Sequence, residues 1–576
     1  MKFFTFLFSF LSITVLAQTN AKYATFFEKG NGNQSAVYKE AISYYKMLAK
    51  NFQSIKIEQM GLTDSGEPLH MVTFNPDKNF DFSVIQKNKA IILINNGIHA
   101  GEPDGIDATM MFFRDLATAK IKIPKNTVIV TIPVYNIDGA LNRNSTSRVN
   151  QNGPEDYGFR GNGRNFDLNR DFIKADTRNT RSFVEIFHKL NPDVFIDNHV
   201  SNGADYQYSL TYIQTQHNKL GTELGNFMNE KMTPEIVADL KNKKIESTPY
   251  VNVWDGTPEK GFPQFVDSPR YATGYTSLFN SMGYVVETHM LKEYSKRVYA
   301  TYEFMVSTLK YVDENVKTIK SIKEKNAGQF KTNSKYPIEW ELDSTKVTKM
   351  NFLGYEGGYK ESDVTTGSRL FYNETKPYNK PINFYSGYKP TKEIVIPEAY
   401  IIPKAQWEVI DLLKWNGCKF TVLKKDSVME VETYRIEDFK TGATAYEGHY
   451  LHRNTKVSKS VKKVQFFKGD YVFSTSQNAV KYIVETLEPE AVDSFFNWNF
   501  FDTILQQKEG YSDYVFEDLA AKFLSENPVI KAEFEEKKKS DKAFADNPSA
   551  QLDWVYKNSP YYEKAHLQYP VYRITK

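Results

Sequence analysis

Between about residues 20 and 325, short apolar runs alternate with longer stretches of helical periodicity, and this alternation restricts the fold more than any other feature. The apolar runs cover residues 90–95, 127–133, 193–197 and 283–287. Runs of this kind are typical of strands buried on both faces of a sheet. Helical stretches separate them, one opened by Pro103 and others over residues 217–242 and from 297 to about 320. The alternation predicts an α/β domain, with a mixed, largely parallel sheet flanked by helices.

The chain changes character after this domain. Residues 323–336 are polar and poor in large aliphatic side chains, and residues 337–390 are rich in the turn formers Gly, Asn and Pro. A second α/β pattern begins at residue 396, with a helix predicted over 407–415, a strand over 418–423 and a helix over 478–487. A chain of 576 residues is also long for a single domain. We therefore expect a first domain over 20–325 and a smaller C-terminal accessory region over 337–576, which is β-rich and then α/β.

The first 17 residues have the pattern of a secretory signal peptide. Lys2 precedes an uncharged stretch that ends at Ala17, and this stretch is short for a transmembrane helix. An N-terminal membrane anchor is the alternative, and no later apolar run is long enough to span a membrane. The single cysteine, Cys418, is expected to be a buried structural thiol and excludes an intramolecular disulfide. A nearly cysteine-free exported protein favours the periplasm or exterior of a bacterium.

The charge balance argues against a nucleic-acid partner. Lys and Arg total 73 and Asp and Glu total 70, so the formal net charge is only +3. Proteins that bind nucleic acid through bulk electrostatics concentrate positive charge.

Metal-binding residue types follow the predicted strands. His99 and Glu102 lie in the loop after the first run, His199 closely follows the third run, and Glu287 ends the fourth. The carboxyl ends of strands are where open α/β sheets bind ligands. The His99/Glu102 pair alone is weak evidence, because about one such H-x-x-[DE] match is expected by chance and a loop hydrogen bond would explain it. Three further segments, at residues 167–170, 197–199 and 287, together with the turn at 136–139, favour a metal site.

In order, spacing and strand context, these segments resemble the zinc carboxypeptidases of the pancreatic carboxypeptidase A type (peptidase family M14). The resemblance covers roughly residues 35–320. The matching segments are the H-x-x-E of His99 and Glu102, the N-I-D-G turn at 136–139 with Ile for Pro, the D-x-N-R of residues 167–170, the strand-ending His199 and the late-strand Glu287.

The resemblance implies one Zn²⁺ held by His99, Glu102 and His199. Two imidazoles and one carboxylate suit zinc, and three protein ligands leave a position for water and substrate. Zinc strongly acidifies a bound water, and Glu287 would take a proton from that water and pass it to the leaving amine. Asp167 is expected to accept a hydrogen bond from a zinc-binding imidazole, which would fix the orientation of that ring.

The same resemblance assigns substrate contacts. Asn169 and Arg170 would bind a terminal carboxylate, which the guanidinium group matches with two hydrogen bonds. An arginine would polarise the scissile carbonyl. Arg148 is preferred for this role because of its offset from the N-I-D-G turn, and Arg160 and Arg164 remain alternatives. The mobile tyrosine of the family matches Tyr271, with Tyr275 as second choice.

Three other histidines carry less weight. His449 and His452 are interpreted as ordinary surface residues, and His289 is expected to pack beside the site or to support it without binding the metal.

The sequence therefore predicts a secreted zinc metallocarboxypeptidase that removes C-terminal residues from peptides. Its partner would be a peptide or peptide-like substrate with a free carboxylate. An enzyme that uses the same site on cell-wall peptides is one alternative. A non-catalytic binding protein of the same fold is another, but it predicts a broken ligand set.

Overall fold

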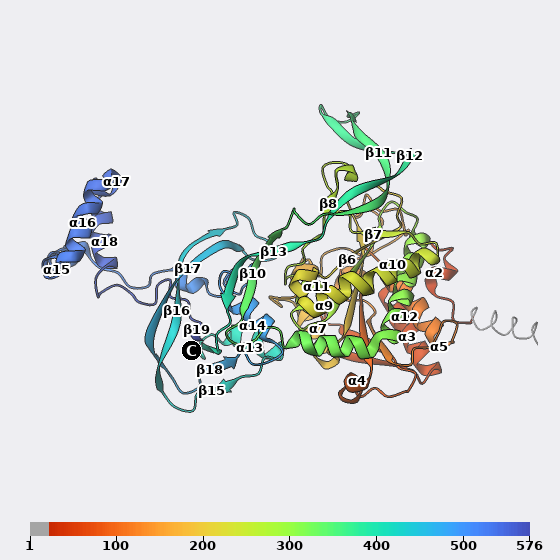
Figure 1. The fold of residues 1–576 in the computed structure, drawn as a ribbon, viewed down its shortest axis with the longest axis horizontal. Coiled ribbons are helices and arrows are strands. Elements are labelled where there is room, and N and C mark those ends of the chain that lie inside the picture. The colour runs from red at the N-terminus through yellow and green to blue at the C-terminus, as the bar shows by residue number, and fades with distance from the viewer. Residues whose placement is uncertain (1–21, 576) are drawn as a thin grey trace, which may run out of the picture.

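A computed structural model describes residues 22–575, so the predicted signal peptide at residues 1–17 lies outside the described residues. An eight-stranded sheet forms the framework of the first domain (Figure 1). Its strands are β1 (Ile55–Leu62), β2 (Pro68–Phe74), β3 (Ala90–Asn96), β4 (Thr127–Ile132), β5 (Val194–Ser201), β6 (Leu210–Gln214), β7 (Ser247–Pro249) and β9 (Met282–His289). The spatial order is β1-β2-β4-β3-β5-β9-β6-β7, and the central strands β4, β3, β5 and β9 run parallel. The predicted mixed sheet is confirmed.

Helices cover both faces of this sheet, as the sequence predicts. On one side lie α2 (Phe26–Lys29), α3 (Tyr38–Asn51), α5 (Asp104–Ala117), α9 (Thr222–Phe227), α10 (Thr233–Asn242) and α12 (Tyr294–Ala327). On the other side lie α4 (Phe82–Asn88), α7 (Arg178–Leu190) and α11 (Ala272–Ser277). Shorter elements of this domain are α6 (Ile137–Leu141), α8 (His217–Leu220) and the 3₁₀ turns Leu168–Arg170 and Pro258–Lys260.

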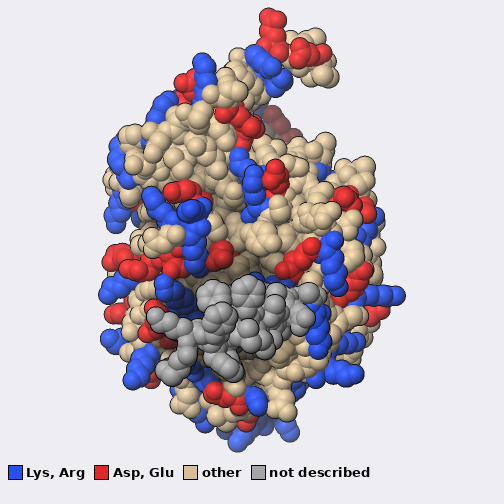
Figure 2. All heavy atoms as spheres, turned by 90° about the vertical axis from the view of Figure 1, so that its right-hand side faces the viewer, with Lys and Arg blue, Asp and Glu red and all other residues tan. Residues whose placement is uncertain are grey.

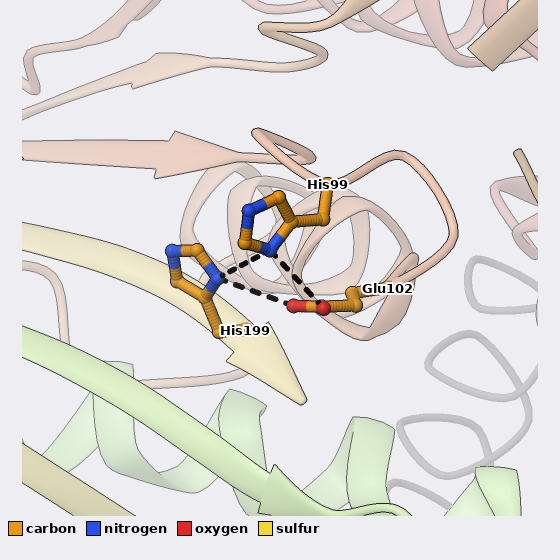
Figure 3. Close-up of side chains that lie close together, drawn as sticks. All are labelled: His99, Glu102 and His199. Atoms are coloured by element: carbon orange, nitrogen blue, oxygen red, sulfur yellow. Dashed lines mark hydrogen bonds and ion pairs between the residues drawn. The ribbon is translucent and has the colours of Figure 1, made fainter. Parts of the chain in front are cut away.

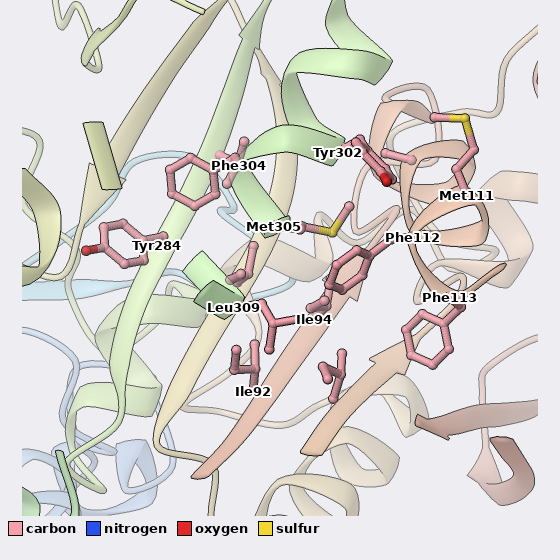
Figure 4. Close-up of a cluster of buried hydrophobic side chains, with 14 of the residues drawn as sticks. Ile92, Ile94, Met111, Phe112, Phe113, Tyr284, Tyr302, Phe304, Met305 and Leu309 are labelled. Atoms are coloured by element: carbon pink, nitrogen blue, oxygen red, sulfur yellow. The ribbon is translucent and has the colours of Figure 1, made fainter. Parts of the chain in front are cut away.

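Alternate residues of β3 enter different cores. Ile92 and Ile94 belong to the core under α5 and α12, whereas Ile91 and Leu93 belong to the core on the opposite face. Side chains alternate in this way because successive residues of a strand point to opposite faces. Figure 4 shows the first core, where Ile92 and Ile94 face aromatic and methionine side chains from α5 and α12. Burial on both sides holds the carboxyl end of β3 rigidly in place.

The helix predicted over residues 217–242 is wrong as one continuous element. The chain forms α8, turns at Gly221, and continues as α9, a π-helical segment (Met228–Met232) and α10. Gly221 has φ +111°, a backbone conformation that side-chain-bearing residues rarely adopt. A glycine inside an apolar periodic stretch was the available signal for this break.

The C-terminal region adds three further sheets. A long hairpin of β11 (Thr348–Glu361) and β12 (Ser368–Tyr385) pairs with the short β8 (Phe262–Pro263) of the first domain, and β10 (Lys335–Leu342) pairs with β13 (Tyr388–Val395). The third sheet contains β14 (Ala399–Ile402), β15 (Thr421–Val422), β16 (Ser427–Thr441), β17 (His452–Phe466), β18 (Tyr471–Ser474) and β19 (Tyr572–Ile574). Its order is β15-β18-β14-β19-β16-β17. The strand predicted over 418–423 is shorter than expected, because only β15 pairs there.

The two regions share a hydrophobic core. The helices α13 (Trp407–Trp415) and α14 (Val480–Leu487), together with β14, pack into the same cluster as α7 and α11 of the first domain. Further along the chain, η4 (Asp502–Leu505) precedes four helices that form an arm at one side of the molecule (Figure 1). These are α15 (Asp513–Glu526), α16 (Pro528–Ser540), α17 (Lys542–Ala545) and α18 (Pro548–Lys557).

The surface carries both signs of charge. Figure 2 shows one face of the molecule, on which Lys and Arg side chains are interspersed with Asp and Glu. Among the helices of residues 22–575, none is both long enough and apolar enough to cross a membrane.

Candidate active site

The three predicted metal-binding residues come from the ends of neighbouring strands. His99 and Glu102 lie in the loop between β3 and α5, and His199 lies on β5 next to β3 in the sheet. Gly97 begins the loop with φ +66°, and a Cβ there would lie 3.1 Å from the Ile106 side chain. The turn at Gly97 therefore directs His99 toward β5.

The side chains of His99, Glu102 and His199 converge (Figure 3). Nδ1 of His99 lies 3.1 Å from Oε1 of Glu102 and 3.3 Å from Nδ1 of His199, whose Nδ1 lies 3.1 Å from Oε2 of Glu102. Donor atoms that bind one tetrahedral zinc at roughly 2.0–2.1 Å are about 3.3 Å apart. The donor set and its spacing therefore fit zinc.

Each imidazole is held through its other ring nitrogen. Nε2 of His99 lies 3.0 Å from Oδ1 of Asp167, and Nε2 of His199 lies 2.8 Å from Oδ2 of Asp197. These contacts leave both Nδ1 atoms directed at the shared point, which is how outer partners orient metal-binding histidines. The predicted contact of Asp167 with a metal-binding imidazole is present, whereas that of Asp197 was not predicted. The D-x-H pattern at 197–199 was the missed signal, because residues two apart on a strand share a face.

The neighbouring charges shift the pKa values of the two buried carboxyl groups, Glu102 and Glu287, in opposite directions. Burial disfavours the ionised form of Glu102, but the positive charges of Arg148 and His99 outweigh it and hold the pKa of that carboxyl well below its usual range. Burial raises the pKa of Glu287 to about 7, with Glu102 and Asp197 acting in the same direction and His199 in the opposite one. A carboxyl group with a pKa near 7 can both accept and release a proton near neutral pH.

Glu287 lies beside the three converging side chains. It is on β9, where its register partner across the sheet is His199 on β5. Both residues line one cavity of about 190 Å³ together with His99 and Glu102. Asn169, Arg170 and Tyr271 line the same cavity. Seven of the nine residues that the sequence singled out therefore line this cavity, and the other two, Asp167 and Arg148, contact the lining residues His99 and Glu102.

The three candidate arginines have different surroundings. Arg160 lines the cavity, and its guanidinium lies 2.9 Å from Oδ2 of Asp167 and 3.3 Å from Nδ1 of His99. Arg148 forms an ion pair with Glu102 at 2.9 Å and packs against Gly101. Arg164 stacks on the Phe166 ring and donates to a backbone carbonyl at the surface. This arrangement favours Arg160, although the family offset favoured Arg148.

Arg170 is fixed by its neighbours. Its guanidinium lies over the Tyr271 ring at 4.6 Å and donates to the backbone carbonyl of Asn169 at 3.0 Å. Burial disfavours its charge, but Asp167, Tyr271 and Tyr446 raise the pKa of Arg170. The alternative tyrosine, Tyr275, is fully buried in the core and donates to Asn416, so Tyr271 is the better-placed candidate.

A tight turn from the C-terminal region reaches this loop. Tyr446 and His449 exchange two backbone hydrogen bonds, and the intervening Glu447 and Gly448 have φ of +50° and +80°. Two positive φ values are the mark of a type I′ turn. Oε2 of Glu447 accepts a hydrogen bond of 2.8 Å from the backbone N–H of Asp167. The C-terminal region therefore contacts the segment that orients His99.

The remaining histidines partly differ from expectation. The interpretation of His452 as a surface residue is wrong: its side chain is buried beside Phe439 and Phe496 and lies 3.0 Å from Asp502. The reason is that β17 begins at His452 and turns it toward the core. His449 is partly covered and lies 2.8 Å from Asp176. His289 is buried against Tyr206, so the expected packing role is confirmed.

Cys418 is also buried, as expected. Burial raises the pKa of its thiol above the usual range, which suits a structural thiol better than a nucleophile.

Comparison with known proteins agrees with this geometry. Residues 41–238 match the family model described as zinc carboxypeptidase, and all three converging side chains fall inside that range. Carboxypeptidase 2 from Trichophyton rubrum and its counterpart from Trichophyton equinum are each 22% identical, over 71% of this chain and 73% of each relative. Carboxypeptidase A from Helicoverpa armigera aligns with a TM-score of 0.38 and 14% identity over 53% of this chain and 80% of that one. The family match is made by the segment that carries the metal-binding geometry, so residues 41–238 are similar to the zinc carboxypeptidases, and this match together with the carboxypeptidase relatives indicates a metallopeptidase.

Proposed function

We propose that the protein is an exported carboxypeptidase that hydrolyses the last peptide bond of its substrate, with Glu287 as general base. The observation that carries the proposal is one cavity with two kinds of lining. The His99, Glu102, His199 and Glu287 side chains line it, and so do Asn169 and Arg170. A site that bound only the reacting peptide bond would not need the carboxylate-binding groups of Asn169 and Arg170.

His99, Glu102 and His199 are the residues that would hold the zinc ion. When bound, zinc would supply Lewis-acid chemistry, polarising the peptide carbonyl and making a water molecule more acidic. Asp167 and Asp197 keep the two imidazoles turned toward this position. Their carboxylates also offset the positive charge that accumulates there.

The proton steps fall to Glu287. Its carboxylate accepts a proton from the attacking water and returns it to the nitrogen of the leaving amine, so the group is regenerated in each cycle. Its position opposite His199 on the adjacent strand supports this role. Arg160 would donate to the carbonyl oxygen as negative charge develops, which is the kind of interaction that stabilises a transition state.

Substrate selection by its free end would rest on Arg170 and Asn169. The guanidinium group binds a carboxylate through two parallel hydrogen bonds. Tyr271 beneath the guanidinium and the Asn169 carbonyl beside it hold its plane in one orientation. A peptide whose end is blocked would lose this contact.

Export through the predicted signal peptide, to the bacterial periplasm or exterior, is part of the proposal. A cell-wall peptide is the alternative substrate. It would bind to the same two residues, Asn169 and Arg170, because Arg170 recognises only a carboxylate. Incubation with cell-wall fragments that end in a free carboxyl group would identify that activity.

The proposal is tested with one peptide in two forms, free and amidated at its carboxyl end, with the products read by mass spectrometry. We expect sequential loss of terminal residues from the free form and none from the amidated form. The Glu287→Gln variant should lose about 10²- to 10⁴-fold in kcat, the typical contribution of a general base, while a metal assay still finds bound zinc. Equal cleavage of both peptides, or full activity of the variant, would contradict the assignment.

A further inference from the structure

A second cavity lies where the first domain meets the C-terminal region. Lys174 and Arg181 of the first domain line it together with residues of α13 and residues between 498 and 503. Its volume is about 600 Å³, compared with about 190 Å³ for the cavity at the candidate active site. Small-molecule sites commonly measure roughly 300–1,000 Å³. The hydrolytic scheme above does not use this cavity, so its lining requires a separate explanation.

Aromatic rings are concentrated in this lining. Three of the six tryptophans of the chain, Trp407, Trp415 and Trp498, belong to it, and we call it the tryptophan cavity. Trp498 is buried, whereas Trp407 is 62% exposed and Trp415 is 46% exposed. The guanidinium of Arg181 lies 4.6 Å from the centre of the Trp415 ring and holds that ring in place. Large apolar side chains that are exposed together mark interaction sites.

The two exposed rings are widely spaced on one helix. Trp407, Asp411 and Trp415 follow one another at intervals of four residues, so their side chains lie along one side of α13. The step of eight residues from Trp407 to Trp415 corresponds to about 12 Å of helix. A ligand that contacts both rings must therefore be extended and contain more than one ring-sized unit.

The charges of the lining are largely balanced within the protein. Four of the lining residues are acidic, and three of them already have a basic partner. These pairs are Asp176 with Lys174, Asp411 with Lys414 and Asp502 with His452. Among the residues that the structure describes, the lining charges left without an ion pair are those of Arg181 and Glu408, which are opposite in sign. This balance suits a neutral ligand better than a cation or an anion.

One polar atom in the lining lacks a hydrogen-bond partner. Nδ2 of Asn499 donates to the backbone carbonyl of Tyr450 at 2.9 Å and to Oδ2 of Asp502 at 3.1 Å. Its buried Oδ1 accepts no hydrogen bond within residues 22–575. Because buried polar atoms are nearly always hydrogen-bonded, this oxygen points to a hydroxyl or amide group of a ligand as its donor.

We propose that the tryptophan cavity binds an oligosaccharide. A sugar ring has an apolar face of C–H groups and a rim of hydroxyl groups. Tryptophan rings match such faces because they provide a large, flat apolar area. Carboxylate and amide oxygens accept hydrogen bonds from hydroxyl groups, and Asp411 and Asn499 provide such oxygens in the same lining as the two exposed rings. Linked sugar units also supply the length that the spacing of Trp407 and Trp415 requires. This inference goes beyond the proposed peptidase function and does not depend on it.

The test is isothermal titration calorimetry of the full-length protein with tetrasaccharides of glucose, mannose, galactose, xylose and N-acetylglucosamine. We expect at least one tetrasaccharide to bind, and to bind more tightly than its monosaccharide, which covers only one ring. Trp407→Ala and Trp415→Ala should each weaken this binding about 10-fold or more, as truncation of a contact tryptophan commonly does. Both side chains are exposed, so these variants should keep the wild-type Tm. Trp340→Ala, on β10 and outside this lining, is the matched control and should bind as wild type.

Three results would overturn the proposal. The first is that none of the five tetrasaccharides binds, and the second is that binding survives both substitutions unchanged. The third is that tetralysine binds more tightly than every sugar and loses affinity in the same variants, which would make the cavity a cation site. Because binding is measured directly, the experiment decides this question even if the protein cuts no peptide.

Discussion

The first domain and the C-terminal region both contact the candidate site, but they contribute different things. All residues found to line the cavity lie between His99 and Glu287, in the first domain. The C-terminal region instead touches the back of this lining. Glu447 accepts a hydrogen bond from the backbone N–H of Asp167, and Asp493 forms an ion pair with Arg270, the residue before Tyr271. The residues that line the cavity and the residues that support them therefore lie in two different parts of the chain.

The support is extensive because the regions share a core. Lys481 on α14 is buried and donates to the backbone carbonyl of Ser277 on α11. Tyr275 on α11 packs against Tyr482 on α14. The segment that carries Tyr271 therefore rests on the C-terminal region, which is more than an appended module.

Among the substitutions that compare the two regions, the largest effect is expected where the first domain would bind the substrate. Arg170→Lys replaces a two-bond clamp by a single ammonium and should lose one charged hydrogen bond, worth about 1.5–3 kcal/mol. We expect kcat/KM to fall about 10- to 100-fold for a peptide with a free carboxyl end, chiefly through KM. Steady-state kinetics would measure this. Arg164→Lys, which lies at the surface, is the control and should change little.

A smaller effect is expected on the pH dependence of the free energy of unfolding, and it shows whether the two regions unfold together. Asp107 on α5 is buried, and its desolvation raises its pKa to about 7. Because the folded state holds this proton up to about pH 7 and the unfolded state releases it near pH 4, stability should decrease as pH rises through that window. The slope contributed is at most about 1.4 kcal/mol per pH unit. Asp107→Asn should remove this contribution.

Tryptophan fluorescence is a suitable probe for that experiment. Five of the six tryptophans lie in the C-terminal region, at 340, 407, 415, 498 and 554, whereas Asp107 lies in the first domain. Denaturant unfolding followed by fluorescence at pH 5 and pH 8 should therefore show the Asp107 effect if the shared core couples the regions. If the substitution does not change the denaturant midpoint of the fluorescence transition, the two regions unfold separately.

The smallest effect is expected at the turn from the C-terminal region. Glu447→Ala removes the acceptor for the Asp167 N–H, a bond whose net contribution is roughly 0.5–1.5 kcal/mol. We expect about a 2- to 10-fold loss in kcat/KM. Glu430→Ala, at an exposed position on β16, serves as control. A loss as large as that of Arg170→Lys would contradict a purely supporting role, because the C-terminal region would then act on the reaction itself.

The metal-binding arrangement was predictable because its elements are local and periodic. Buried strands are recognisable as apolar runs, and parallel strands bring His99 and His199 to one edge of the sheet. The choice between Arg148 and Arg160 was not predictable, because both lie in an irregular loop whose path depends on distant contacts. The contact between Glu447 and Asp167 spans 280 residues and leaves no local pattern.

One consequence follows from the place of β19 in the third sheet. Residues 572–574 lie between β14 and β16, strands that begin at 399 and 427. During synthesis, nearly 150 residues must be added after the start of β16 before β19 is available to pair between these two strands. Until then each exposes an unpaired edge, which invites association with other chains. Assembly of this sheet is thus a late event in biosynthesis, even though the peptidase framework is made first.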